Sequence, residues 1–374
     1  MRKWNRIAIV HQWLLSMRGA ERVAEAMCDL FPDADLFTLI YVPEKISPAI
    51  RRHKVRTSFL QKLPGSARYH RRLALLFPFA AEQFDLKDYD LVISSDWGVA
   101  KSIITRPETC HVCYCNTPPR YAWSLYHFYR NFETNWLERF LMSGVMNYFR
   151  VWDLATSFRV DYFIGNSQNV ARRIRKYYRR DAEVIYPPVD TCRFQMSDQV
   201  EDYYLSVGEL LPNKRHDLPI EACSQLKRRL LVVGSGLDYK RLRQLAGPTV
   251  ELLGAVRDEE LARLYARCRA LIFPAEEDFG IIPVEVQAAG RPVIAYRAGG
   301  AMETVVEGVT GMFFNKQEVA SLQEVILAFE TKESSFDPET IRQHALQFDL
   351  EVFQSRLMDF LQRKWPEYLE NYGC

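Results

Sequence analysis

The nine residues Glu277-Asp278-Phe279-Gly280-Ile281-Ile282-Pro283-Val284-Glu285 form the most informative turn in this sequence of 374 residues. The apolar run 271–273 leads into them through Pro274 and predicts a buried strand. Residues 284–289 predict the start of a helix that Gly290 ends. A strand, a turn and a helix in this order place the amino end of the helix at the carboxyl edge of a parallel sheet, where open α/β sheets bind ligands.

This turn carries groups for two kinds of ligand chemistry. Gly280 allows a ligand to approach the backbone closely, and the N–H groups of the first helical turn attract an anion. Glu277 on the loop and Glu285, about one turn inside the helix, flank this anion site. Carboxylates repel phosphate, so their natural partners are hydroxyl groups, those of a sugar and of a ribose. A phosphate between two sets of hydroxyl groups describes a nucleotide-sugar.

The surrounding motifs resemble those of a known family. Glu-x7-Glu with Phe-Gly and Pro inside it is followed by Ala-x-Gly-x-Pro-Val at 288–293 and by Gly-Gly-x-x-Glu at 299–303. This series resembles the retaining glycosyltransferases of family 4, and the resemblance extends from Ile7 to about Phe360. It implies an α/β protein of the GT-B fold, with two Rossmann-like domains facing each other across a cleft. The alternative, a β-α unit with surface glutamates, does not explain Phe-Gly-Ile together with the downstream Gly-Gly.

Length and composition agree with a soluble protein of two domains. A chain of 374 residues is too long for one ordinary core. The hydrophobic content of 48% and charged content of 26% are those of a globular protein, and a net charge of +2 does not demand a nucleic-acid partner. The eight cysteines have no disulfide-framework spacing and no secretory signal is visible, which predicts the cytoplasm. No run reaches the roughly 18 apolar residues that a membrane-spanning helix needs.

The predicted domain division rests on proline and on the resemblance. Pro187-Pro188-Val189-Asp190 can neither continue a strand nor enter a helix cleanly, so it is the expected linker. We therefore predict an acceptor-binding domain over residues 1–188 and a nucleotide-sugar-binding domain over residues 189–349. In GT-B proteins the final helix crosses back to the first domain, so the amphipathic segment 350–374 is assigned there.

Two patterns imitate metal sites. Cys110, Cys113 and Cys115 cluster on a predicted strand without a second pair of ligands, and Asp88-Tyr89-Asp90 directly precedes the apolar run 91–93. Both patterns fit strands better than metal sites. Because GT-B enzymes act without a metal, the resemblance implies neither a metal ion nor another cofactor.

Two residues of the first half are candidates by resemblance. Gly19, after the predicted strand 7–10, matches the family's amino-terminal Gly-Ala-Glu-Arg loop and is expected to bind the donor. Asn116 follows the predicted strand 111–115, where a subgroup associated with bacterial surface polysaccharides usually has a histidine beside the reacting sugar. Asparagine can bond a sugar hydroxyl but cannot act as an acid or base near neutrality. His111 lies five residues too early to replace that histidine and is expected in the core or at its edge.

The loop 209–215 is expected to hold the donor's diphosphate. Relatives place an arginine and a lysine there; Lys214 matches the lysine, but Glu209 stands where the arginine would be. Either Glu209 points away, or Arg215 supplies the missing charge. Relatives also seat the nucleobase against the backbone near Val256. The resemblance thus implies catalytic roles for Glu277, Lys214 and Asn116, and donor binding by Gly19, Arg215, Val256, Phe279, Gly280, Ile281 and Glu285.

Residues 45–81 contain no acidic residue, and basic side chains alternate there with aromatic and aliphatic ones. One interpretation is a solvated basic face over a core; the other is a basic amphipathic surface that lies on anionic lipid. A membrane-embedded polyprenyl-diphosphate acceptor would need such a surface. The aromatic-rich segment 121–163 has roughly helical spacing, which indicates core packing or, alternatively, a groove for an acceptor lipid.

The function implied by the resemblance is transfer of a hexose from UDP-glucose or GDP-mannose to a lipid-linked glycan, in bacterial exopolysaccharide or O-antigen synthesis. Such an enzyme would work in the cytoplasm, on the inner face of the plasma membrane. Protein groups would neutralise the departing nucleoside diphosphate, and no covalent intermediate is expected. Two alternatives remain open: a nucleotide-sugar-binding protein without catalysis, in which Asn116 and Glu209 mark lost functions, and a nucleotide-sugar epimerase.

Overall fold

The computed structural model describes residues 4–132 and 136–372 and divides the chain into two compact units. Unit 1 contains the residues up to Tyr186 together with those from Phe353 onward, and unit 2 contains Pro187–Val352. The sequence placed these boundaries after residues 188 and 349. Residues 373 and 374 of the predicted final helix, and residues 133–135 of the aromatic-rich segment, lie outside the described residues.

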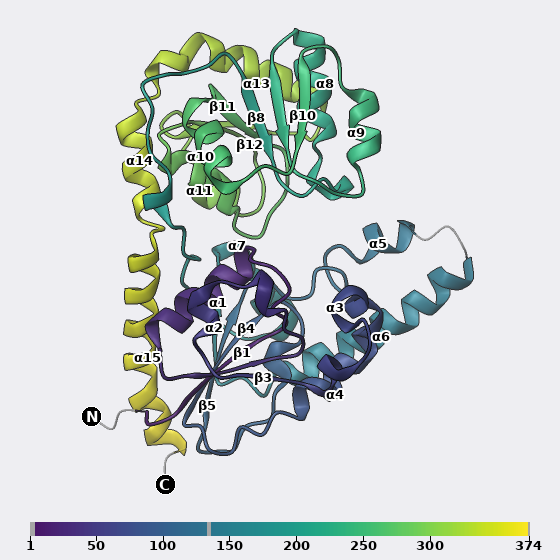
Figure 1. Ribbon diagram of the computed structural model, residues 1–374, viewed down its shortest axis with the longest axis vertical. Coiled ribbons are helices and arrows are strands. Elements are labelled where there is room, and N and C mark those ends of the chain that lie inside the picture. The colour runs from purple at the N-terminus through teal and green to yellow at the C-terminus, as the bar shows by residue number, and fades with distance from the viewer. Residues whose placement is uncertain (1–3, 133–135, 373–374) are drawn as a thin grey trace. The chain divides into compact units, whose positions relative to one another are not determined.

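Unit 1 is built on a parallel sheet of seven strands in the order β3-β2-β1-β4-β5-β6-β7 (Figure 1). Every residue of the strands β4 and β5 is buried, as expected for a parallel sheet covered on both faces. The strands are β1 (Ile7–His11), β2 (Asp35–Thr38), β3 (Val55–Thr57), β4 (Leu91–Asp96), β5 (Cys110–Cys115), β6 (Tyr162–Gly165) and β7 (Ala182–Val184).

The final helix of the chain packs on unit 1. The ring of Phe353 meets Tyr114 of β5 edge-on at 5.6 Å, and Gln354 donates a hydrogen bond of 3.2 Å to the carbonyl of Ala26. The helices of unit 1 are α1 (Gly19–Leu30), α2 (Pro48–Arg51), α3 (Ser66–Tyr69), α4 (Phe77–Glu82), α5 (Tyr126–Phe132), α6 (Trp136–Ser157), α7 (Gln168–Tyr178) and α15 (Leu350–Tyr372). Among the helices in the described part of the chain, none has the length and apolar character needed to cross a bilayer.

Unit 2 contains a second parallel sheet, with six strands in the order β10-β9-β8-β11-β12-β13. Its strands are β8 (Tyr204–Val207), β9 (Leu230–Val233), β10 (Val250–Gly254), β11 (Ala270–Phe273), β12 (Val293–Tyr296) and β13 (Gly311–Phe314). Its helices are α8 (Asp217–Leu226), α9 (Tyr239–Leu245), α10 (Asp258–Arg267), α11 (Ile281–Ala288), α12 (Ala301–Thr304), α13 (Val319–Lys332) and α14 (Pro338–Leu346). The predicted α/β class with two parallel sheets is confirmed.

The strand order of unit 2 contains a topological switch point between β8 and β11. From β8 the chain builds the sheet outward through β9 and β10, and from β11 it builds the opposite side through β12 and β13. Doubly wound sheets bind ligands outside the carboxyl ends of their strands at such a point. Here the two loops that leave these ends are 208–216 and 274–280, which contain the predicted lysine and the first predicted glutamate.

Candidate functional site

The candidate site begins where β11 ends and α11 starts. Gly280 directly precedes the helix and has φ +88°, a left-handed conformation that a side chain disfavours. A Cβ at this position would make ordinary contacts, 3.5 Å from the ring of Phe273 and 3.6 Å from Pro283, so the requirement for glycine is conformational and not steric. Gly280 makes no side-chain capping bond, and the amino end of a helix attracts a ligand with negative charge.

The start of α11 corrects one prediction. The sequence suggested a helix from Val284, but α11 begins three residues earlier, at Ile281. Pro283 is therefore the third residue of the helix. This position tolerates proline because the first four N–H groups of a helix have no partner within it. The earlier start places Ile281 in the first turn and leaves Glu285 one turn inside.

Gly299 and Gly300 hold the Glu277 loop in place. A Cβ on Gly299 would lie 2.3 Å from the carbonyl oxygen of Glu277, and one on Gly300 would lie 2.1 Å from that of Phe279. The N–H of Gly300 also donates to the carbonyl of Glu277 at 2.9 Å. The Gly-Gly pair that served as a family signature is thus a packing requirement, since larger residues would push the loop away.

Two of the predicted catalytic residues meet in this site. Lys214 ends the 3-10 helix η6 (Pro212–Lys214) after β8, and its ammonium group forms an ion pair with the carboxylate of Glu277. The two side chains are 24% and 23% exposed, so solvent reaches the pair. Because solvent reaches both groups, the ion pair is screened, and either group can exchange its partner when a ligand binds.

Arg215 is engaged elsewhere. It adopts the left-handed conformation with φ +57°, and its guanidinium forms two parallel hydrogen bonds with Asp217, 3.1 Å from Nε to Oδ1 and 3.0 Å from Nη2 to Oδ2. Of the two alternatives left open for Glu209, compensation by Arg215 therefore involves a guanidinium that a neighbouring carboxylate already balances. Glu209 itself is exposed to solvent. A role for Arg215 in donor binding remains a prediction and requires its release from Asp217.

Glu285 has a buried partner that the sequence did not reveal. The hydroxyl of Tyr265 on α10 donates a hydrogen bond of 2.9 Å to Oε2 of Glu285. Burial, followed by the charge of Glu285, raises the pKa of Tyr265 well above its usual value, so the phenol keeps its proton. Tyr265 occupies a core position of an amphipathic helix, and only the fold shows that its hydroxyl reaches Glu285.

Val256, the predicted base contact, follows β10 at the edge of the sheet and is half-buried. In the sheet order β10 is separated from β8 by β9, so Val256 lies beside a different strand end from Lys214. Phe279 is buried, and its ring packs edge-on against Phe348 at 5.4 Å. This contact fixes the backbone that carries the N–H groups of residues 279–281.

The remaining candidates belong to unit 1. Gly19 is the first residue of α1, and the N–H of the preceding Arg18 donates to the carboxylate of Glu21 at 3.2 Å. Asn116 directly follows β5; its N–H donates to the carbonyl of Asp96 at 2.7 Å, and its side-chain amide donates to the hydroxyl of Ser95 at 3.2 Å. Asn116 is thus held at the carboxyl end of the sheet, with its amide oriented by the neighbouring strand.

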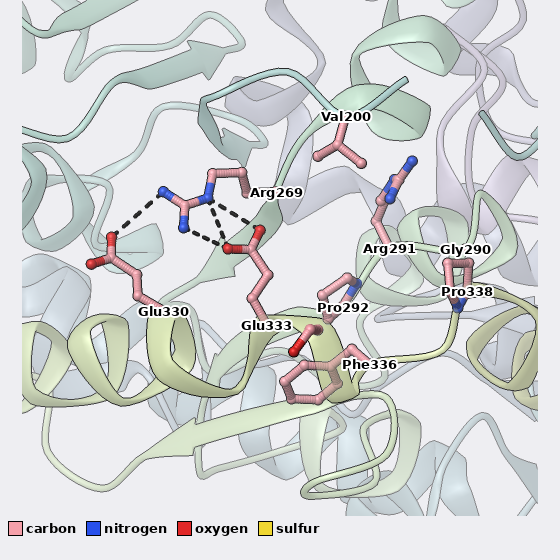
Figure 2. Close-up of a pocket in the computed structure, with 10 residues that line it drawn as sticks. Val200, Arg269, Gly290, Arg291, Pro292, Glu330, Glu333, Phe336 and Pro338 are labelled. Carbon is pink, nitrogen blue, oxygen red and sulfur yellow. Dashed lines mark hydrogen bonds and ion pairs between the residues drawn. The ribbon is translucent and has the colours of Figure 1, made fainter. Parts of the chain in front are cut away.

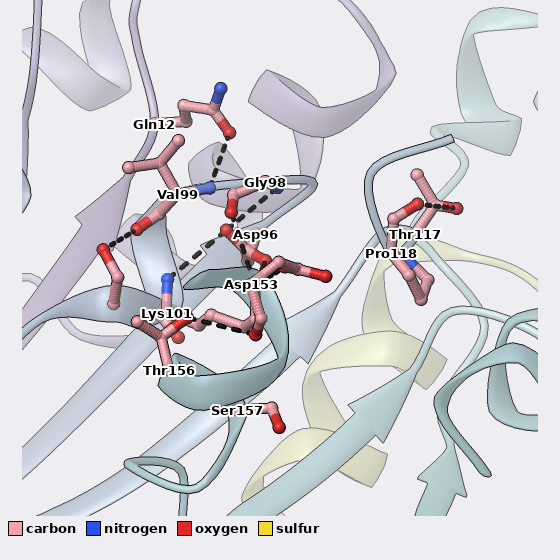
Figure 3. Close-up of polar contacts among 12 residues, drawn as sticks. Gln12, Asp96, Gly98, Val99, Lys101, Thr117, Pro118, Asp153, Thr156 and Ser157 are labelled. Carbon is pink, nitrogen blue, oxygen red and sulfur yellow. Dashed lines mark hydrogen bonds and ion pairs between the residues drawn. The ribbon is translucent and has the colours of Figure 1, made fainter. Parts of the chain in front are cut away.

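A buried ionic cluster joins Asp96 at the end of β4, Lys101 in the segment after it, and Asp153 of α6 (Figure 3). Lys101, in the 3-10 helix η4 (Ala100–Ser102), has no solvent exposure and pairs with Asp153 and, at 3.5 Å, with Asp96. Burial alone would lower the pKa of Lys101, but the two carboxylates outweigh burial and raise it. Trp123 also donates to Asp153 at 2.8 Å, which anchors the loop after Asn116.

His111 is a core histidine, as expected. It has no exposure, and its ring nitrogens lie 2.8 Å from the Ser94 hydroxyl and 3.1 Å from the carbonyl of Arg159. Burial lowers its pKa to about 4, so the ring is neutral at physiological pH. Within the described residues, no group of three or more histidine, cysteine or acidic side chains is arranged to hold a metal ion.

Unit 2 also has a pocket of about 490 Å³ away from the candidate site. Figure 2 shows Arg269, which precedes β11, bonded to Glu333 and paired with Glu330. Pro292, which precedes β12, lines the same pocket. The pocket therefore lies at the amino ends of the strands, opposite to the Lys214–Glu277 pair. Of its two arginines, Arg269 is neutralised by carboxylates, and Arg291 donates to the backbone carbonyls of Ala266 and Ser197.

Two family models match the chain in succession. The model described as Glycosyltransferase Family 4 matches residues 17–193, and the model described as Glycosyl transferases group 1 matches residues 193–345. Among solved structures, Anabaena HepE in complex with UDP has a TM-score of 0.73 at 20% identity, covering 96% of this chain and 100% of that one. HepE has also been solved with UDP-glucose.

Sequence relatives match over shorter ranges. The D-inositol 3-phosphate glycosyltransferase of Geodermatophilus obscurus is 31% identical over 202 residues, 45% of each protein. The GDP-mannose-dependent alpha-(1-6)-phosphatidylinositol monomannoside mannosyltransferase of Mycolicibacterium smegmatis is 29% identical over 199 residues, 42% of this chain and 52% of that protein. The chain thus spans about half the length of these relatives.

The two parallel sheets and the similarity to solved structures define the GT-B fold. The family models narrow this class: the chain belongs to the family 4 glycosyltransferases, as the Glu-x7-Glu motif predicted.

His216, two residues after Lys214, yields a test of the packing beneath the site. It is buried, its Nδ1 lies 2.9 Å from the Ser206 hydroxyl, and burial together with the charge of Lys214 lowers its pKa to about 4. Because the unfolded chain titrates near 6.5, the stability contribution is complete above that pH and is lost as the pH falls toward 4. The loss amounts to roughly 3 kcal/mol.

We therefore expect His216→Gln to flatten the pH dependence of the unfolding free energy of unit 2 between pH 6.5 and 4. Urea titrations at half-unit pH intervals measure the slope, with wild type and variant compared first at pH 8, where the difference reflects packing alone. An unchanged slope would show that His216 does not titrate between the folded and unfolded states as described.

Proposed function

We propose that this family 4 glycosyltransferase is a retaining hexosyltransferase that uses a nucleotide-sugar donor and a lipid-linked glycan acceptor. The observation that carries the proposal is the meeting of Lys214 and Glu277 in front of the amino end of α11. This arrangement offers a cation and N–H groups for a diphosphate, and carboxylates on either side for hydroxyl groups. A ligand whose diphosphate joins two groups that both carry hydroxyls, a sugar and a ribose, is a nucleoside diphosphate sugar.

The difficult step is departure of the nucleoside diphosphate. Lys214 and the N–H groups of residues 279–281 would stabilise the charge that develops on the leaving phosphate. When the donor's phosphate pairs with Lys214, the carboxylate of Glu277 would become able to accept hydrogen bonds from the donor sugar. Its negative charge would also stabilise the cationic transition state of that sugar. Glu285 would accept from the ribose hydroxyls. The acceptor's proton passes to the leaving phosphate, so neither a covalent intermediate nor a metal ion is needed.

Asn116 would contact the donor sugar as a hydrogen-bond partner only, because its amide has no acid or base function near neutrality. The ionic cluster around Lys101 supports this role by fixing Asp96 at the end of β4, whose carbonyl accepts from the N–H of Asn116. For the donor, HepE with bound UDP-glucose supports a uridine nucleotide, and the Mycolicibacterium relative supports GDP-mannose. We favour UDP-glucose slightly.

An acceptor carried on polyprenyl diphosphate requires access to a membrane. In the segment from α3 to α4, Tyr69 and Phe79 are 44% and 57% exposed, and the guanidinium groups of Arg68 and Arg72 lie over the Tyr69 ring. Exposed basic and aromatic side chains in a segment without acidic residues are complementary to anionic lipid headgroups. These features support our proposal that the protein works on the inner face of the plasma membrane, with this segment against the lipid.

A donor screen tests the proposed function. Purified protein should show a thermal shift with one nucleotide-sugar from a panel that includes UDP-glucose and GDP-mannose, and slow hydrolysis of the same compound. Added polyprenyl-diphosphate-linked glycan should accelerate donor turnover and yield a product of retained anomeric configuration. Binding without turnover would favour a non-catalytic binding protein, and epimerised donor in the absence of acceptor would favour an epimerase.

Substitutions separate the roles of the charged residues. We expect Lys214→Ala and Glu277→Ala each to reduce turnover by about two to three orders of magnitude, since each removes a group that acts on the transition state. Glu285→Ala should mainly raise the donor KM. Lys240→Ala removes an exposed lysine of α9 and serves as the matched control. Undiminished transfer by Lys214→Ala would overturn the diphosphate role.

Vesicle binding tests the membrane surface. The protein should co-sediment with vesicles of phosphatidylglycerol in preference to phosphatidylcholine. Replacing Arg68 and Arg72 by alanine should weaken this binding about tenfold or more, because each basic residue contributes about 1 kcal/mol near an anionic surface. Replacing Arg175 and Lys176 on α7 gives a control with the same loss of charge. Equal binding to both kinds of vesicle would refute the proposed surface.

A further inference from the structure

The hydrogen bond between Tyr265 and Glu285 joins α10 to α11 beneath the proposed ribose site. Tyr265 has no solvent exposure, and its ring packs against Phe194 with centroids 5.5 Å apart. Its hydroxyl donates to Oε2 of Glu285 at 2.9 Å, while Glu285 itself is partly exposed. One end of this contact is therefore fixed in the core, and the other end reaches the surface where a ligand can bind.

The tyrosine is held rigidly in its place. The backbone carbonyl of Leu264, the residue before it, accepts a hydrogen bond of 2.9 Å from the buried hydroxyl of Tyr203. The carbonyl of Tyr203 in turn accepts from the N–H of Arg269, which leads into β11. The phenol oxygen thus has a defined position relative to the strand that precedes the Glu277 loop.

A glutamate without such a partner would be a poor ligand for a diol. Its terminal torsion is broad, so the two carboxylate oxygens can take many orientations, and each orientation lost on binding costs entropy. To accept from two adjacent ribose hydroxyls, both carboxylate oxygens must face them at the same time. A charge-assisted hydrogen bond to Oε2 from a buried donor selects one orientation before the ligand arrives.

We infer that Tyr265 is a positioning residue that presents the Glu285 carboxylate to the adjacent 2′ and 3′ hydroxyls of the donor's ribose, and so sets the preference for ribonucleotides over 2′-deoxyribonucleotides. The inference rests on the proposed function, because it takes Glu285 as the ribose contact. Recognition of the ribose would then depend on a residue that touches neither the sugar nor the reacting atoms.

The variant Tyr265→Phe tests this inference, since it removes one oxygen and keeps the ring that packs on Phe194. Calorimetric titration should show UDP binding weakened about five- to tenfold if UDP-glucose is the donor, or GDP binding if GDP-mannose is the donor. The discrimination between this diphosphate and its 2′-deoxy analogue should fall by a similar factor. The kcat at saturating donor should stay within about twofold of wild type, because the contact acts on binding.

Tyr203→Phe is the matched control, because it removes the phenol oxygen of another buried tyrosine, which bonds to α10 but not to Glu285. An equal loss of discrimination in Tyr203→Phe would assign the effect to general packing of α10 and overturn the inference, as would unchanged discrimination in Tyr265→Phe. A double-mutant cycle adds a second measurement: in a Glu285→Ala background, Tyr265→Phe should have no further effect on diphosphate affinity.

The double-mutant cycle also separates the ribose-binding role of Glu285 from the positioning role of Tyr265. If Glu285→Ala retains the wild-type preference for the ribonucleotide, the ribose site itself is placed wrongly. If Glu285→Ala loses the preference and Tyr265→Phe keeps it, the ribose site stands and the positioning role of Tyr265 falls.

Discussion

The close approach of two loops at the carboxyl edge of unit 2 is the constraint on which its site depends. Gly299 and Gly300 let the loop after β12 lie directly against the backbone of Glu277 and Phe279, where any Cβ would collide with a carbonyl oxygen. This contact fixes the position of the Glu277 backbone relative to the strand ends. It therefore also determines where the carboxylate of Glu277 can pair with Lys214. The geometry of a charged pair is thus set by backbone packing between residues that carry no charge.

The sequence revealed what depends on local pattern. Glu277, Gly280 and Glu285 could be assigned because a buried strand, a glycine turn and a helix follow one another within 20 residues. Their spacing alone places one carboxylate on the loop and the other one turn into the helix. Lys214 was identified by resemblance, yet its ion pair with Glu277 joins loops 63 residues apart and follows only from the strand order.

What the sequence could not reveal depends on tertiary partners. No local pattern marks Tyr265 or Lys101, because burial and a carboxylate distant in the sequence give each of them its contacts. The sequence left open whether Glu209 points away or Arg215 supplies the missing charge; in the structure Asp217, two residues away, holds the guanidinium of Arg215. The start of α11 was misplaced because Pro283 was taken as part of the turn, although proline is compatible with the third helical position.

The Lys214–Glu277 ion pair has a consequence for selectivity among anions. Under the proposed function, a free phosphate engages Lys214 but offers Glu277 no hydroxyl group. A sugar diphosphate engages both members of the pair in the same event, through its phosphate and its hydroxyls. The pair would therefore favour ligands that combine an anionic group with neutral hydrogen-bonding groups over inorganic anions that carry only the first.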